Sequence, residues 1–183
     1  MPDVEQFRLR AARRADVPRI EQLIQRSVRA LSVAHYDEAQ IESALRFMFG
    51  VDSQLIDDGT YHVIEADGVL AAAGGWSRRR TLFGGDQWKH GADEPLDPTQ
   101  EPARIRAFFV DPAWARRGLG RSLFDVCVRD ARTAGFRRME LMATLPGEPL
   151  YRALGFTAGE RIDLELPDSV RVPLVKMSRS IED

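Results

Sequence analysis

Cysteine is almost absent from this chain. The single cysteine among 183 residues, Cys127, excludes an intramolecular disulfide. It falls on the apolar face of a predicted helix, which favours a buried, inert thiol over a nucleophile. Histidine is scarce too, with 3 residues, and no spacing of Cys and His is typical of a metal site. The sequence therefore predicts no metal cofactor.

Long hydrophobic runs and a strong charge of either sign are also missing. The longest apolar run, Val69 to Trp76, contains two glycines and is far too short to span a bilayer. Residues 1–14 lack the apolar stretch of a signal peptide. The formal net charge is −2 and the pI about 6.0, whereas nucleic-acid-binding domains are usually strongly basic. We therefore expect no membrane partner, no nucleic-acid partner and a cytoplasmic location.

The composition is that of an ordinary globular protein. Hydrophobic residues make up 44% of the chain and charged residues 30%, which is not typical of a disordered protein. A chain of this length suits one core, and no linker or internal repeat interrupts it. We expect a single domain over residues 1–183.

The first third of the chain predicts one strand and two helices. Residues 7–11 can form a short strand. Apolar residues recur at helical spacing over 17–31, after Asp16 as the expected N-cap. A second helix is expected from residue 38, because Asp37 and Gln40 resemble a capping box. A hairpin then follows, with Asp67-Gly68 as its turn.

Residues 78–102 are rich in glycine, proline and charge and predict a long loop, and such loops are usually functional or mobile. The second half then alternates strands with helices. The expected strands are Ile105–Val110, Met139–Ala143, Phe156–Arg161 and Val172–Ser178, and the expected helices are 119–134 and Glu148–Leu154.

The most informative segment is the glycine-containing turn between a strand and a helix at Arg116–Arg121. Unpaired N–H groups at a helix N-terminus, with the helix dipole, favour a phosphate or pyrophosphate. Gly118 and Gly120 allow close approach to the backbone, and three arginines add positive charge. A tight turn without a ligand is the alternative. Leu123 breaks the Gly-x-Gly-x-x-Gly pattern of a Rossmann site, and no P-loop pattern is present.

Two blocks in this half resemble the GNAT superfamily of N-acetyltransferases. Val110-Asp111-Pro112 with Ala115–Gly120 is similar to the family's coenzyme-binding motif, although Ala115 stands where the family usually has Arg or Gln. Leu150–Phe156 is similar to its Tyr-x-x-Leu-Gly-Phe element. Thr144 occupies the place often held by a coenzyme-binding Asn.

The resemblance implies a GNAT fold, an α/β arrangement with a central mixed, mostly antiparallel, twisted sheet of six or seven strands and about four helices. It implies acetyl-CoA as cosubstrate and direct transfer of its acetyl group, in a ternary complex, to a primary amine of a small molecule or peptide. A protein amine is a further acceptor of that kind. The coenzyme-binding residues that it implies are Phe108, Phe109, Val110, Arg116, Arg117, Gly118, Leu119, Gly120, Arg121, Ser122 and Thr144.

Tyr151 is the catalytic residue that the resemblance implies, as the acid that protonates the leaving thiolate. An aromatic that packs beneath the coenzyme is the alternative role. The family's strand glutamate is replaced by arginine or alanine at positions 104, 106 and 107. The general base is therefore left open among His35, Asp37, His62, Glu148 and water.

In the family the acceptor tends to lie near the first helix pair and the loops by the central strand. Trp76, Phe83 and Trp88 could wall an apolar pocket there, and they are equally expected as core or loop anchors. A coenzyme-binding sensor or docking protein without turnover is a second hypothesis for the whole chain. The identity of the acceptor and the choice between a monomer and a homodimer stay open.

Overall fold

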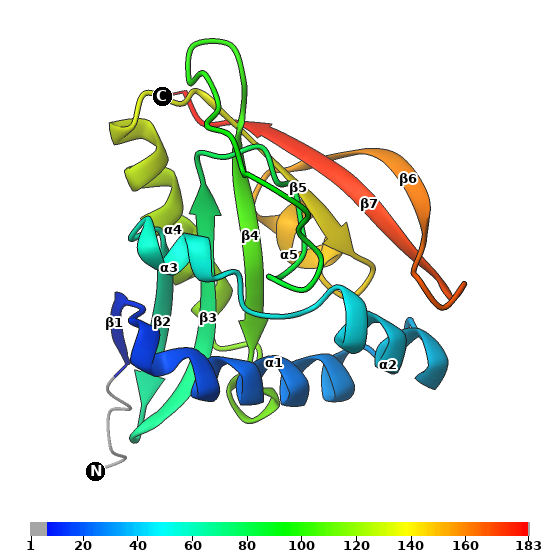
Figure 1. Cartoon of the computed structure of the whole chain (residues 1–183). Helices are drawn as coiled ribbons and strands as arrows, with labels where there is room; N and C mark the ends of the chain where they lie inside the picture. Colours follow the sequence, from blue (N-terminus) through cyan, green and yellow to red (C-terminus); the bar gives the residue numbers. More distant parts are fainter. Residues whose placement is uncertain (1–6, 183) are drawn as a thin grey trace.

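A mixed sheet organises the molecule (Figure 1). The computed structural model describes residues 7–182, and within them seven strands lie in the order β1-β2-β3-β4-β5-β7-β6. All neighbouring strands are antiparallel except β4 and β5. The strands are β1 Arg8–Ala11, β2 Tyr61–Ala66, β3 Val69–Ser77, β4 Ala103–Val110, β5 Arg138–Thr144, β6 Thr157–Glu165 and β7 Arg171–Ser180.

Five α-helices cover the two faces of this sheet in the described residues. They are α1 Val17–Leu31, α2 Glu38–Phe47, α3 Ser53–Asp57, α4 Leu119–Thr133 and α5 Glu148–Ala153. The first three pack on one face and the last two on the other. The predicted α/β GNAT-type sheet is therefore confirmed. Among residues 7–182, no helix has both the length and the apolar character that a membrane span requires.

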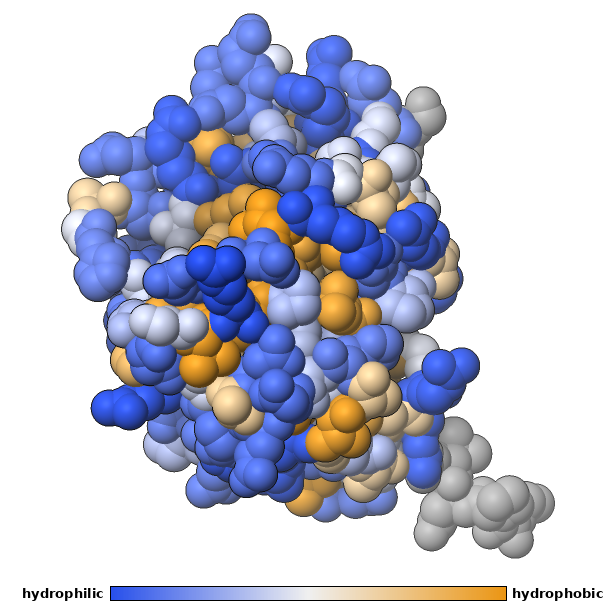
Figure 2. Space-filling view, turned by 90° about the vertical axis from the view of Figure 1, so that its right-hand side faces the viewer, coloured by the Kyte–Doolittle hydropathy of each residue, from blue (hydrophilic) through white to orange (hydrophobic). Residues whose placement is uncertain are grey.

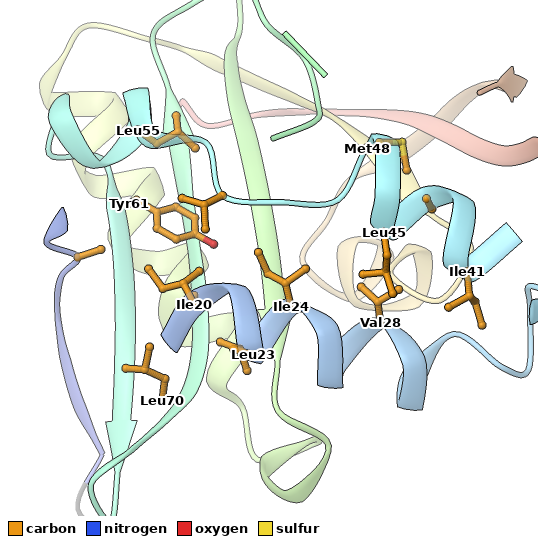
Figure 3. Close-up of a cluster of buried hydrophobic side chains, with 14 of the residues drawn as sticks. Ile20, Leu23, Ile24, Val28, Ile41, Leu45, Met48, Leu55, Tyr61 and Leu70 are labelled. Atoms are coloured by element: carbon orange, nitrogen blue, oxygen red, sulfur yellow. The ribbon is translucent and has the colours of Figure 1, made fainter. Parts of the chain in front are cut away.

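The core on the α1 face follows from the helical spacing in the sequence (Figure 3). Ile20, Leu23, Ile24 and Val28 fall on one side of α1 and are buried against β2, β3 and β4. The figure shows these side chains between the helix and the strands, with those of α2 beside them. The periodicity had predicted the bounds of α1, which are confirmed.

Helix starts were predicted with mixed success. The capping box is confirmed, because the Gln40 N–H donates to the Asp37 carboxylate at 2.8 Å and the Gln40 side chain accepts from the Asp37 N–H. Asp16 makes no cap bond to α1. Its carboxylate instead accepts from the Arg10 guanidinium and the Arg13 N–H. The short helix α3 was not predicted.

The hairpin between β2 and β3 is confirmed. Asp67 and Gly68 both adopt positive φ, at 49° and 77°, as a two-residue hairpin turn requires. On the opposite side of the sheet, α4 packs over β2, β3 and β4. Its buried residues include Leu123 and Cys127, so the thiol is buried as expected.

Candidate active site

The central feature of the site is a gap between β4 and β5. These strands pair only at Ala103 with Met139 and at Arg104 with Glu140. Beyond that point β4 stays on β3 and β5 stays on β7. Backbone groups on the facing edges are thus free of strand partners and can pair with an extended ligand.

A β-bulge in β4 accompanies the divergence. Across from Gly74 of β3, the strand carries two residues, Ala107 and Phe108, where regular pairing has one. Ala107 has a φ of 55°, which is uncommon for a residue with a Cβ. The buried Tyr61 hydroxyl donates to the Ala107 carbonyl oxygen at 2.8 Å. That hydrogen bond stabilises the bulge from the α1 side.

Tyr151 lies behind the gap on the α4 side. Its ring is 6.2 Å from that of Phe108 and 5.8 Å from that of Phe156, and only 8% of the residue is exposed. Burial raises the pKa of its phenol well above the ordinary value. The hydroxyl therefore keeps its proton at neutral pH, as a proton donor must.

The turn that was predicted to bind a phosphate lies between β4 and α4. Arg116 and Gly118 both adopt the left-handed conformation, with φ of 62° and 81°. Gly118 is the N-cap of α4 and supplies no side chain to the first N–H groups of the helix, which leaves them available to an anion. A Cβ on Gly118 would meet nothing within 4 Å. Arg26 of α1 donates to Asp111 at 3.0 Å and ties the preceding segment to the domain.

Gly120 of α4 lies close to α5. A Cβ at this position would lie 2.8 Å from the Leu150 Cδ2 atom of α5. The absence of a side chain at Gly120 therefore allows α4 and α5 to pack closely, and Gly120 does not face open space. Of the two glycines, Gly118 is the one that faces an open side.

The remaining predicted coenzyme residues lie along the same edge. Ser122 is exposed in the first turn of α4, and its hydroxyl donates to the Gly118 carbonyl at 3.3 Å. Leu119 is buried, so only its backbone can serve a ligand. The guanidinium of Arg117 lies 4.9 Å from the centre of the Trp114 ring. Phe109 and Val110 continue β4 from Phe108, half-buried, to the start of the turn.

Thr144 ends β5 beside Tyr151. Its hydroxyl oxygen accepts the Gly147 N–H at 3.2 Å and retains its own proton for donation. A Cβ on Gly147 would lie within 3.3 Å of both the Thr144 hydroxyl and the Tyr151 ring, so the two residues flank the start of α5. The structure thus brings Phe108, Thr144 and Tyr151 together around the gap.

Arg121 lies farther along the surface. It lines a hollow of about 510 Å³ on the outer side of α4, which Arg129, Arg132 and Arg179 also line. Its guanidinium reaches the Ala153 carbonyl at 3.5 Å. Arg121 therefore follows the turn in the chain, while its side chain lines this basic hollow.

The carboxylate and histidine candidates for a base are engaged elsewhere or distant. Glu148 is paired with Arg152 and Arg161 at 2.8 and 3.2 Å. Asp37 caps α2. His35 is exposed in the turn after α1.

His62 is buried under α4 on the side opposite α1. Its Nε2 atom lies 3.5 Å from an Asp130 carboxylate oxygen, and β3 separates its strand from β4. Burial lowers its pKa below the ordinary value. No ring nitrogen of His62 has a hydrogen-bond partner in residues 7–182.

The long loop is held by a buried ion network that sequence reasoning missed. Arg106 is 2% exposed, and its Nη2 atom donates to Asp52 at 2.9 Å and to the Gly84 carbonyl at 2.6 Å. Its Nη1 atom donates to the Thr81 carbonyl at 3.1 Å. Lys89 donates to the other Asp52 oxygen at 2.7 Å. The sequence signal was a single arginine inside the apolar run Ile105–Val110.

Of the two roles left open for Trp76, the structure shows the core anchor and not a pocket wall shared with Phe83 and Trp88. It is 3% exposed and packs on the α4 face, 5.9 Å from the Phe136 ring. Phe83 and Trp88 lie 5.5 Å apart and pack against the core on the α1 face. The alternation of side chains along β3 separates Trp76 from the other two.

Comparison with known proteins identifies the class to which this arrangement belongs. The model of the acetyltransferase (GNAT) family matches residues 20–156, which is more than half of the chain. The chain therefore belongs to the GNAT acetyltransferase family, and the family implies acyltransferase activity. No sequence among curated proteins matches the chain.

Solved structures share the fold at low sequence identity. A GCN5-related N-acetyltransferase from Rhodopseudomonas palustris superposes with a TM-score of 0.70 at 17% identity, over 97% of this chain and 98% of that one. The PaiA N-acetyltransferase of Thermoplasma acidophilum, solved with coenzyme A, gives 0.63 at 13%, over 96% and 99%. YncA of Salmonella typhimurium, solved with acetyl-CoA, gives 0.60 at 18%, over 97% and 95%.

Proposed function

We propose that this protein moves the acetyl group of acetyl-CoA directly to a primary amine while both substrates are bound. The observation that carries the proposal is the gap between β4 and β5, with a protonated phenol behind it and, at the end of β4, a turn whose first helical N–H groups have no side-chain cap. Two solved relatives in fold contain coenzyme A or acetyl-CoA. An extended pantetheine arm suits the unpaired strand edges, and a pyrophosphate suits the N–H groups after Gly118.

The proposed chemistry requires few side chains. The amine attacks the thioester carbonyl, a backbone N–H of β4 stabilises the oxyanion, and the phenol of Tyr151 gives its proton to the departing thiolate. Orientation of the two substrates supplies much of the acceleration.

No free carboxylate is needed as a base if the amine arrives neutral. A free primary amine has a pKa near ~10.4, so only a small fraction is neutral in water at pH 7. Apolar surroundings disfavour the ammonium form and raise that fraction at the site. Water can then accept the proton.

Two measurements test the proposal. Acetyl-CoA should raise the melting temperature, because it binds the native state alone. Incubation with acetyl-CoA and a panel of primary amines should release free coenzyme thiol and acetylated amine in equal amounts. A thermal shift without turnover on any amine would instead support a coenzyme-binding sensor. If acetyl-CoA causes no thermal shift and no amine is acetylated, the proposal is wrong.

A further inference from the structure

Partly buried apolar side chains of five separate segments pack against the core on the α1 side of the sheet. Each is half-buried, so each presents part of its surface to solvent. Phe49 packs edge-on against Phe109 at 6.0 Å, and Phe83 lies 5.5 Å from Trp88. Met142 of β5 and Ile162 of β6 pack against the same core. Figure 2, viewed from the side of β6 and β7, shows hydrophobic residues in a hollow framed by hydrophilic ones.

One wall of this apolar hollow is fixed by the buried network. Arg106 holds the carbonyls of Thr81 and Gly84, and Lys89 is anchored on Asp52. The segment between residues 81 and 89, which carries Phe83 and Trp88, is thus tied at both ends. Side chains held in this way lose little freedom when a ligand packs on them.

The other side of the hollow is tied to α2. Ser43 donates to Asp168 at 2.7 Å, and Gln40 donates to the Arg171 carbonyl at 2.9 Å. The Tyr36 hydroxyl donates to the Pro173 carbonyl at 2.7 Å and accepts the Leu145 N–H at 2.9 Å. These bonds join the α1–α2 region to the β6–β7 hairpin and to the end of β5. The α1–α2 region is therefore held against the strands on the β5 side of the gap.

The carboxylates near the hollow are already paired with cations of the protein, which disfavours an acceptor that carries a second positive charge. Asp52 is paired with both Arg106 and Lys89. Glu140, at the point where β4 and β5 diverge, is paired with Arg104 and, at 3.4 Å, with Lys176. Each of these two carboxylates thus already faces two cations, and Lys89 also lies 3.8 Å from Asp93. Each of these carboxylates has a cation beside it, so none is left for a second ammonium group.

We infer that the acceptor is a monoamine with an apolar, preferably aromatic, body, and this inference rests on the proposed function. The body would pack on Phe49, Phe83, Trp88 and Phe109, and the amine would point to the thioester in the gap. Apolar burial of one ring favours such an acceptor over a short amine by ~10- to 100-fold in kcat/KM. Polyamines and lysine side chains in basic peptides are disfavoured by the paired carboxylates.

The full chain is assayed at saturating acetyl-CoA with ethylamine, hexylamine, 2-phenylethylamine, tryptamine, spermidine and a lysine-containing peptide. We expect 2-phenylethylamine or tryptamine to exceed ethylamine and spermidine at least ~10-fold in kcat/KM. Comparable or better turnover of spermidine or the peptide overturns the inference and leaves the proposed function intact. Absence of turnover on every amine overturns the proposed function and the inference with it.

A variant series locates the body of the acceptor. Trp88→Ala should raise KM for 2-phenylethylamine about tenfold and leave KM for ethylamine and the acetyl-CoA thermal shift unchanged. Phe83→Leu is the milder second variant if Trp88→Ala folds poorly. Val69→Ala, at an exposed valine in the β2–β3 hairpin, is the matched control and should change nothing. The assignment is contradicted if KM rises equally for 2-phenylethylamine and ethylamine. It is also contradicted if neither Trp88→Ala nor Phe83→Leu raises KM for 2-phenylethylamine.

Discussion

The two sides of the gap between β4 and β5 are built in different ways. On the coenzyme side, the turn before α4 offers backbone N–H groups and two left-handed residues, Arg116 and Gly118. On the α1 side, the hollow is made of side chains from five segments, and a buried arginine holds one of its walls. A backbone site depends on a few adjacent positions, whereas a side-chain site depends on positions scattered along the chain.

This difference predicts how each side responds to substitution. Changes in the turn should affect acetyl-CoA binding with little effect on the choice of amine. Changes in the buried network should affect stability and the acceptor, with little effect on acetyl-CoA. A substitution in the turn that changes the choice of amine would show that the two sides are coupled. So would a substitution in the buried network that weakens acetyl-CoA binding.

The largest expected effect is on stability, at Arg106. Within residues 7–182, Arg106→Met leaves Lys89 as the one cation paired with Asp52 and removes the donors of the Thr81 and Gly84 carbonyls. Removal of one partner of a buried ion pair costs about 3–5 kcal/mol. Urea unfolding should show a loss of that size, while folded protein keeps its affinity for acetyl-CoA.

An exposed ion pair provides the control for Arg106→Met. Arg14 pairs with Asp57 at the surface, with 60% and 46% of the two side chains exposed, and Arg14→Met should change the urea midpoint little. If the two variants lose equal stability, Arg106 does not hold the loop wall.

The next effect concerns the turn, at Gly118. Gly118→Val places a β-branched side chain at a φ of 81°, on the open side of the turn, where it would block an anion. The stabilisation by acetyl-CoA at 100 times its dissociation constant is about 2.7 kcal/mol, and this variant should lose it. Thermal unfolding with and without acetyl-CoA measures the loss.

Gly59 supplies the matched control for that variant. It also has a positive φ, of 72°, with nothing within 4 Å of a Cβ, but it lies in the turn before β2. Gly59→Val should carry similar backbone strain and keep the full acetyl-CoA shift. If Gly118→Val keeps the shift as well, the coenzyme does not approach this residue.

Local sequence signals predicted the elements around the coenzyme side well. The periodicity over 17–31 gave α1, Asp67-Gly68 gave the hairpin turn, and Gly118 before an amphipathic run gave the start of α4. In each of these cases the deciding interactions lie within a few residues along the chain.

The acceptor side could not be predicted in the same way. Arg106 and Asp52 are 54 residues apart, and nothing local indicates that they pair. Trp76 and Phe83 differ in the face of the sheet that they occupy, which depends on the register of β3. The five-residue helix α3 is too short for periodicity to identify, since one turn repeats no pattern. The bulge at Ala107 arises from strand pairing, and its alanine carries no turn signal.

A smaller effect is expected at Tyr151, which lies where the two sides meet. Tyr151→Phe keeps the ring contacts with Phe108 and Phe156 and removes only the hydroxyl. The thiolate is a tolerable leaving group without an acid, since a thiol has a pKa near ~8.5. We therefore expect kcat to fall about tenfold, below the ~100-fold low end for general-acid catalysis, at unchanged acetyl-CoA affinity. Unchanged kcat with weaker binding would make Tyr151 a packing residue.

The smallest effect should come from His62, which lies away from the gap and tests whether the α4 face is independent of the site. Its pKa is lowered chiefly by burial, and Asp130 opposes that shift. The folded protein therefore binds the proton less readily than the unfolded chain, whose histidine has a pKa near ~6.5. Stability from His62 is present above that pH and is lost as the pH falls below it, by at most about 1.4 kcal/mol per pH unit. Urea unfolding at pH 7.5 and 5.5 should show this loss in the native chain and in His35→Gln, an exposed-histidine control. His62→Gln should flatten it, and an unflattened profile would assign the pH dependence to other groups.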